Sequence, residues 1–224
     1  MTNTLHRYGE AETFRDDYIV FAIPSRGRND QGCAEKLQAF LRLALKYKPI
    51  NMGNAKYGAL YEPSPDLSPT VHWRRKDKRD FQKVISAVDG PTTVAVVFDN
   101  LGAAQKFLAE VKQADLGMSV NISTSVEGAQ SCCHAAGLTR HSVEYSLGFQ
   151  GRLDRLPDRQ VLELATMCGH GMVSFNLVKK MIDWVREGRR TPEQACAYMA
   201  RFCSCGIFNP TRAGRILEAA RSGG

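Results

Sequence analysis

Residues 92–124, TTVAVVFDNLGAAQKFLAEVKQADLGMSVNIST, contain two strand patterns separated by a helix pattern. The run TTVAVVFDN (92–100) is apolar and rich in β-branched residues, which is typical of a buried strand. Residues 101–117 have apolar side chains at helical spacing and end at Gly117, a common helix stop. MSVNIST (118–124) predicts another strand. A helix between two strands favours a sheet with helices packed against it.

The flanking chain continues this alternation up to about residue 150. DYIVFAIP (17–24) predicts a first strand, followed by a polar loop and the helical pattern CAEKLQAFLRLALKY (33–47). Other segments predict a short hairpin and loop in 49–70, a charged helix over 73–83, a helix over 126–137 capped by Ser125, and a strand HSVEYSLGF over 141–149. We therefore predict an α+β or α/β domain over residues 1–150, with helices on one or both faces of a small sheet.

From residue 151 onward the pattern is entirely helical. Four segments have apolar residues at helical spacing: 158–167, 174–188, 191–202 and 209–222. Thr191-Pro192 with Gln194, and Asn209-Pro210, are cap and first-turn signals. Residues 151–224 thus form a predicted helical, cysteine-bearing unit.

The composition of the chain limits the classes of protein to which it can belong. The chain has 224 residues, 43% of them hydrophobic, which is enough for a substantial core. Seven cysteines and an N-terminus without a secretory signal pattern argue against a disulfide framework and favour a cytoplasmic, reducing location. The longest apolar runs fall far below the ~20 residues of a membrane-spanning helix, so we expect no membrane association.

A net charge of +7 and a pI near 9.1 raise the question of nucleic acid. The densest basic run, WRRKDKRDFQK (73–83), also carries aspartates and fits a solvated helix face, so nucleic acid is the less favoured partner. The charge fits a small anionic substrate equally well. A homo-oligomer is compatible with the sequence, which sets no oligomeric state.

The stretch ATMCGHGMVS (165–174) is unusual for a loop between two helices. Gly169 and Gly171 bracket His170, and Cys168 precedes them. A second loop between helices, RFCSCGIFNP (201–210), carries two further cysteines. Because each loop follows an odd-numbered helix of the unit, the two loops can lie at the same end of it. We predict a metal centre held by Cys168, Cys203 and Cys205, with Cys132 or its neighbour Cys133 as the fourth ligand.

Three kinds of site are compatible with these residues. Cysteines in glycine-rich loops suit an iron–sulfur cluster, for example of the 4Fe–4S type, which is our first expectation. Zinc is the alternative, with His170 completing a Cys₃His set, although the ligand pairs lie closer in sequence than is usual. A metal-free reactive thiol is the third possibility. Cys33 and Cys196 are expected to be ordinary core residues.

Two further groups of polar residues are candidate substrate sites. Arg26 and Arg28 follow the first predicted strand and precede a helix, where they could orient a carboxylate or phosphate. Phosphate-loop and dinucleotide-binding consensus motifs are missing from the sequence.

The second group lies at the junction between the two predicted domains. Arg140 is a third candidate for substrate binding, and His141 and Tyr145 would share one face of the predicted strand as acid/base candidates. With His170 as proton donor, these residues predict a metal- or cluster-dependent enzyme, lyase- or dehydratase-like, acting on a small anion. The alternative is a zinc-stabilised, non-catalytic module that binds nucleic acid or a protein.

Overall fold

The computed structural model describes residues 5–55, 80–144, 146–203 and 205–222, and its centre is a four-stranded sheet. The strands are β1 (Tyr18–Ile23), β2 (Asn51–Asn54), β3 (Val94–Phe98) and β4 (Ser119–Ser123), in the order β2-β3-β1-β4. Every neighbouring pair is antiparallel. The fold is therefore α+β, which confirms the first of the two predicted classes.

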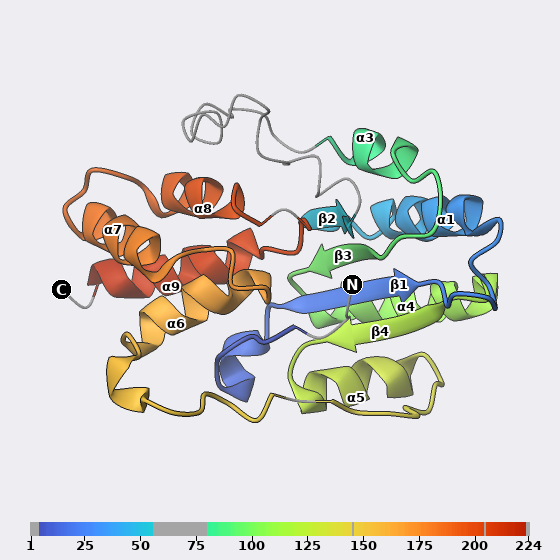
Figure 1. The fold of residues 1–224 in the computed structure, drawn as a ribbon, viewed down its shortest axis with the longest axis horizontal. Coiled ribbons are helices and arrows are strands. Elements are labelled where there is room, and N and C mark those ends of the chain that lie inside the picture. The colour runs from blue at the N-terminus through green and yellow to red at the C-terminus, as the bar shows by residue number, and fades with distance from the viewer. Residues whose placement is uncertain (1–4, 56–79, 145, 204, 223–224) are drawn as a thin grey trace.

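The connections give two interleaved halves, β1-α1-β2 and β3-α4-β4 (Figure 1). The two strands of each half are parallel and are separated by one strand of the other half, which is the split βαβ arrangement. The helices of this part are α1 (Cys33–Leu45), α3 (Phe81–Ser86), α4 (Leu101–Ala114) and α5 (Val126–Ala135). Side chains of Asn100 and Ser125 cap α4 and α5, respectively.

Both faces of the sheet are covered, which explains why its inner strands lack a polar alternation. Val20 and Val96 face a core formed with α1, α3 and α4. Ile19 and Val97, their neighbours in the same strands, face a second core formed with the C-terminal helices. The sequence of a strand that has apolar contacts on both faces is a continuous run of apolar residues.

The C-terminal helices are gathered beside the sheet at the left of Figure 1. They are α6 (Arg159–Ala165), α7 (Phe175–Arg186), α8 (Pro192–Ala200) and α9 (Pro210–Ser222). The predicted capping box at the start of α8 is present, with reciprocal hydrogen bonds between Thr191 and Gln194. None of the described helices is long and apolar enough to cross a membrane.

Short 3-10 helices complete the regular structure. They are η1 (Ala11–Phe14), η3 (Leu153–Arg155) and η4 (Thr166–Cys168).

A buried group of charges ties the helical unit to the N-terminal part. We call Arg7, Asp17, Asn209 and Arg212 the Asp17 cluster. Arg7 and Arg212 both pair with Asp17 Oδ2, and Asn209 Nδ2 donates to Asp17 Oδ1. The ring of Phe14 lies against both guanidinium groups, 5.0 Å from that of Arg7 and 3.9 Å from that of Arg212.

Three segments predicted from the sequence either differ in the structure or lie partly outside the described residues. The strand predicted over 141–149 is wrong, because the described residues of this segment have no strand pairing and most are exposed. Of the hairpin predicted in 49–70, the structure describes only β2 and its flanks. Most of the charged helix predicted over 73–83 lies outside the described residues, and α3 begins at Phe81.

Candidate functional site

The loop between α6 and α7 folds tightly around the thiol of Cys168. Gly169 and Gly171 both have left-handed backbone conformations, with φ of 70° and 68°, which L side chains rarely adopt. Their turns bring the backbone N–H of Met172 to 3.3 Å from Cys168 Sγ. A side chain at Gly169 would also collide with Leu5. The glycines are therefore needed both for the turn and for the close packing of the N-terminal segment.

The loop between α8 and α9 is bent in a similar way around Cys203. Phe208 N–H donates to Cys203 Sγ at 3.2 Å, and Gly206 has a left-handed φ of 77°. This loop lies directly against β2, because a Cβ at Gly53 would overlap the carbonyl of Cys205. Gly53 thus allows the loop to approach the sheet.

The two loops follow α6 and α8, the first and third helices of the unit, and they meet at the same end of it, as their positions in the sequence predict. Cys205 Sγ lies 3.8 Å from Cys203 Sγ and 3.4 Å from His170 Nδ1. Cys168 is close enough to Cys203 for the two thiols to interact electrostatically. We call Cys168, His170, Cys203 and Cys205 the thiol cluster.

The surroundings of the sulfurs combine burial with backbone donors. Burial and the neighbouring Cys203 raise the pKa of Cys168, while backbone N–H groups of the 170–173 turn partly oppose the increase. The hydrogen bond between Cys205 and Cys203, together with burial, raises the pKa of Cys205. These two cysteines are therefore thiols at neutral pH, and a metal would have to displace their protons.

The imidazole of His170 differs from these thiols because its residue is exposed. Desolvation of the ring still lowers its pKa, against the opposing effect of a hydrogen bond that the ring donates to the backbone of Cys168. The ring is therefore neutral at pH 7, with a lone pair available to a proton or a metal.

The thiol cluster is not a closed metal cage as it stands. Among the residues that the structure describes, no three His, Cys, Asp or Glu side chains converge in a way that would hold a metal ion. The members of the cluster instead touch pairwise, through Cys203 with Cys205 and through Cys205 with His170. Binding of a metal would require these side chains to turn toward one point.

A small cavity borders the thiol cluster on the side of the sheet. It encloses about 10 Å³, the space of roughly one water molecule. Its walls consist of side chains and backbone of Leu5, Phe21, Gly53, Ala55, Thr93, Ala95, His170, Cys205 and Ile207. The lining is largely apolar, and the described residues that form it include no lysine or arginine, so it offers room for a small uncharged group next to Cys205.

Cys132 does not join the thiol cluster. It is fully buried in the core on the opposite face of the sheet, beside α1 and α4, whereas Cys168 and Cys203 belong to the core of the helical unit. Burial raises the pKa of Cys132 to about 12. The hypothesis that Cys132 or the adjacent Cys133 supplies a fourth ligand is therefore wrong for this arrangement, because the sheet separates α5 from the two loops. Cys33 and Cys196 are buried, as predicted.

The predicted anion-binding arginines lie away from the thiol cluster. Arg26 and Arg28 are exposed in the loop beyond the arrowhead of β1, at the end of the sheet away from α6–α9 (Figure 1). Arg140 donates to the carbonyl of Val126 and lines a shallow, open pocket along α5. The structure therefore does not bring these three arginines to the candidate metal site.

The prediction of two acid/base candidates in the 141–149 segment can be followed for His141 alone. His141 is exposed in a stretch without regular structure, and Tyr145 lies outside the described residues. The prediction that His141 and Tyr145 share one face of a strand is wrong, because the described residues of this segment form no strand.

Sequence reasoning missed Gly53 and Leu5, which border the thiol cluster. Gly53 interrupts an otherwise plausible strand, NMGN, and a glycine inside a strand is a known signal of close backbone approach. Leu5 gave no comparable signal, because its contact with the glycine loop joins positions far apart in sequence. No protein-family model, curated protein or solved structure matches this chain.

Proposed function

We propose that the thiol cluster binds a soft metal centre and that the protein is a metal- or iron–sulfur-dependent enzyme. The observation that carries this proposal is the contact of Cys205 with both Cys203 and the neutral imidazole of His170, where two glycine-bent loops meet. Backbone N–H groups are also directed at the sulfurs of Cys168 and Cys203. Such N–H donors stabilise thiolates, the form in which cysteine binds a metal. A merely buried cysteine does not need these glycines.

The spacing of the cluster is close to that of a tetrahedral site. Zn–S bonds of about 2.3 Å at a tetrahedral angle place two sulfurs about 3.8 Å apart. Cys203 Sγ and Cys205 Sγ have this separation. An iron–sulfur cluster, our first expectation, would hold its sulfurs farther apart, so the left-handed turns at Gly169 and Gly206 would have to open slightly around it.

The metal would supply a Lewis acid next to the cavity, and His170 would handle the proton. A neutral, exposed imidazole beside Cys205 can accept a proton from a substrate or return it to one. This division of roles suits a lyase or dehydratase reaction, in which a proton and a hydroxyl group leave neighbouring atoms. A small anionic substrate remains our proposal, but it would have to approach from the side of His170, since the cavity itself is apolar.

The first experiment measures metal, sulfide and visible absorption in protein purified without oxygen. We expect iron and sulfide with a broad absorption band in wild type, and loss of both in Cys168→Ala and Cys203→Ser. Cys132→Ala is the matched control: it removes an equally buried thiol from the other face of the sheet and should keep the metal. Wild-type protein without any bound metal would overturn the proposal.

A cytoplasmic location fits this proposal. None of the seven cysteines forms a disulfide in the structure, and a reducing compartment keeps cysteines in this state. The matching test is the redox state of the cysteines in protein alkylated directly in lysed cells, where we expect reduced thiols.

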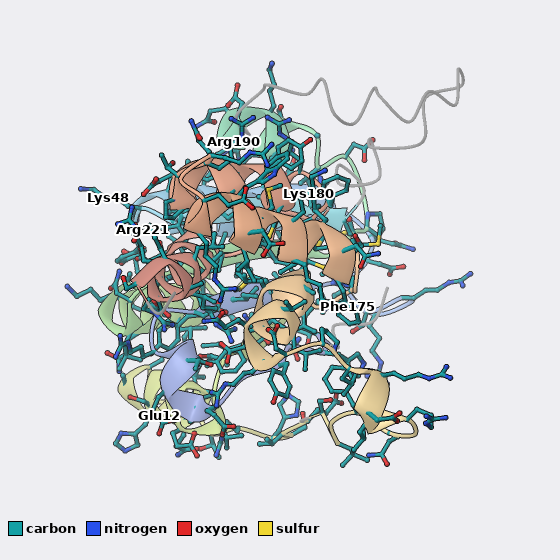
Figure 2. All side chains as sticks on the ribbon, turned by 90° about the vertical axis from the view of Figure 1, so that its left-hand side faces the viewer. Glu12, Lys48, Phe175, Lys180, Arg190 and Arg221 are labelled. Carbon is teal, nitrogen blue, oxygen red and sulfur yellow. The ribbon has the colours of Figure 1, made fainter. Side chains whose placement is uncertain are left out.

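A second candidate function is that of a non-catalytic module whose helical unit is stabilised by zinc. The observation that favours it is the single-ion spacing of the thiol cluster, together with a basic surface on the helical unit. Lys180, Arg189 and Arg190 surround the ring of Trp184 at 5.0–5.5 Å, and Figure 2 shows Lys180 and Arg190 on the same side of the molecule. Stoichiometric zinc and RNA or DNA binding that weakens steeply with salt would favour this module over the enzyme.

A further inference from the structure

The thiols of Cys203 and Cys205 form a pair whose chemistry does not require a metal. Their sulfurs are 3.8 Å apart within one short loop, so a disulfide needs an approach of only about 1.8 Å. Cys205 is partly exposed, whereas Cys203 lies 1% exposed behind it. An oxidant can therefore reach one sulfur while the other is already positioned to attack it.

Polar groups contact both sulfurs of this pair. His170 Nδ1 lies 3.4 Å from Cys205 Sγ, within reach of its proton. Cys203 Sγ accepts a hydrogen bond from Phe208 N–H. Cys196, another buried thiol of the same core, instead lies 3.7 Å from the carbonyl of Pro210.

We propose that Cys203 and Cys205 are a reversible dithiol–disulfide pair that hydroperoxides oxidise, and that this oxidation releases the metal. The second half of the proposal rests on the proposed function, while the disulfide itself does not. Oxidation would consume two of the three thiolate ligands and leave Cys168 alone with His170. A redox signal would thereby switch the metal centre off.

The reaction balances with hydrogen peroxide as the oxidant. The sulfur of Cys205 attacks one peroxide oxygen as its proton leaves, the O–O bond breaks, and a sulfenic acid and hydroxide form. The sulfur of Cys203 then attacks Cys205 Sγ, the S–S bond forms, and the sulfenic oxygen leaves as hydroxide. The two thiol protons convert both hydroxides to water. The sulfurs lose two electrons in total, and the peroxide gains them.

The test uses the reduced, metal-free full chain treated with one equivalent of hydrogen peroxide. Trypsin cleavage after Arg201 and Arg212 yields one peptide, residues 202–212, whose only cysteines are Cys203 and Cys205. We expect this peptide to be two hydrogen atoms lighter and resistant to alkylation, and dithiothreitol should restore two alkylatable thiols. If the peptide stays doubly alkylated, or if Cys203 is found linked to Cys168, the pair proposed here is wrong.

Variants separate this proposal from that of the metal site. Cys205→Ser should lose the intrapeptide disulfide completely, and Cys196→Ala, a buried thiol of the same core, should keep it. Cys168→Ala should lose bound metal yet still form the disulfide. If the wild-type protein forms the disulfide but never binds metal, the proposal of a metal site is wrong and the proposal of a dithiol–disulfide pair is supported.

The release step is measured on zinc-loaded protein with a colorimetric chelator. We expect peroxide to release the metal in step with disulfide formation, and dithiothreitol to allow rebinding. Retention of zinc by protein whose 202–212 peptide is oxidised would overturn the switch.

Discussion

The Asp17 cluster and the thiol cluster both join the helical unit to the N-terminal part, but they differ in how their polar groups are paired. In the Asp17 cluster a fully buried carboxylate lies between two guanidinium groups, and Asn209 adds an amide donor. Opposite charges therefore compensate each other there, although Nε of Arg7 and Nε of Arg212 have no hydrogen-bond partner among the described residues. In the thiol cluster the sulfur of Cys205 contacts the sulfur of Cys203 and the ring of His170, which are all groups that can bind a metal.

We infer that the Asp17 cluster has a structural role and propose a functional one for the thiol cluster. Burying charge is costly unless opposite charges and hydrogen bonds compensate it. In the Asp17 cluster two ion pairs and an amide donor compensate the buried carboxylate, and the cluster links the N-terminal segment, the start of β1 and α9. Cys168 and Cys203 also pack in the core of the helical unit, but packing does not account for the contact of Cys205 with the exposed His170.

The strongest way to test this comparison is to break the Asp17 cluster. Arg212→Leu leaves Asp17 buried with one guanidinium partner fewer, and removal of one partner from a buried pair costs about 3–5 kcal/mol. We expect the free energy of unfolding in urea to fall by about that amount. Arg221→Leu, which removes an exposed pair with Glu218, is the control and should cost less than about 1 kcal/mol. Similar losses in both variants would contradict a structural role for the cluster.

A mutation at Gly53 should affect the thiol cluster more than the rest of the fold. In Gly53→Ala the new Cβ meets the carbonyl of Cys205, and overpacking of this kind costs about 1–3 kcal/mol. Because the loop must move, we also expect weaker metal binding, measured by competition with a chelator. Gly90→Ala is the matched control, since a Cβ there contacts nothing within 4 Å. Unchanged metal binding in Gly53→Ala would show that the loop does not need its contact with β2.

The contribution of the Asp17 cluster to stability should also depend on pH. Burial raises the pKa of Asp17, but Arg7 and Arg212 outweigh burial and hold the pKa below its ordinary value. A carboxyl group whose folded pKa is lowered stabilises the protein above its unfolded pKa of about 3.9, and this stability is lost as pH falls toward the folded pKa. The stability difference between wild type and Asp17→Asn in urea should therefore shrink as pH falls below about 4. A difference that stays constant down to pH ~3 would rule out this titration.

The smallest effect is expected at a site that belongs to neither cluster. Thr191→Ala removes the cap at the start of α8, which should cost about 1 kcal/mol in thermal or urea unfolding. Thr191→Ser keeps the hydroxyl and should restore most of the stability. Metal binding should be unchanged in both, so a loss of metal in Thr191→Ala would show that the position of α8 controls the thiol cluster.

Local signals predicted much of the fold. The apolar runs gave β1 and β3, and the helical spacing and cap residues gave α4, α8 and α9 close to their observed positions. The segment 141–149 failed because a short alternation of apolar and polar residues is a weak strand signal without a partner strand. The described residues of that segment pair with neither edge strand of the sheet, β2 or β4.

The candidate site was only partly predictable. Glycine and cysteine spacing identified both loops, and the order of the helices placed them at one end of the unit. The choice of Cys132 failed because a pattern along the chain cannot tell which face of a sheet a helix covers. The role of Gly53 depends on a contact with Cys205, more than a hundred residues away in sequence.

The sequence by itself determined the strands, the helices, their caps and the two glycine-bent cysteine loops, because each depends on the conformational preferences of neighbouring residues. Only the tertiary structure decided that Cys203 and Cys205 meet His170, that the sheet separates Cys132 from them, and that Arg212 is buried against Asp17. Those contacts depend on how distant segments pack, and packing responds to the shape and charge of the whole chain. The arrangement of the candidate site is therefore set by long-range contacts, while the sequence supplies its cysteines and His170.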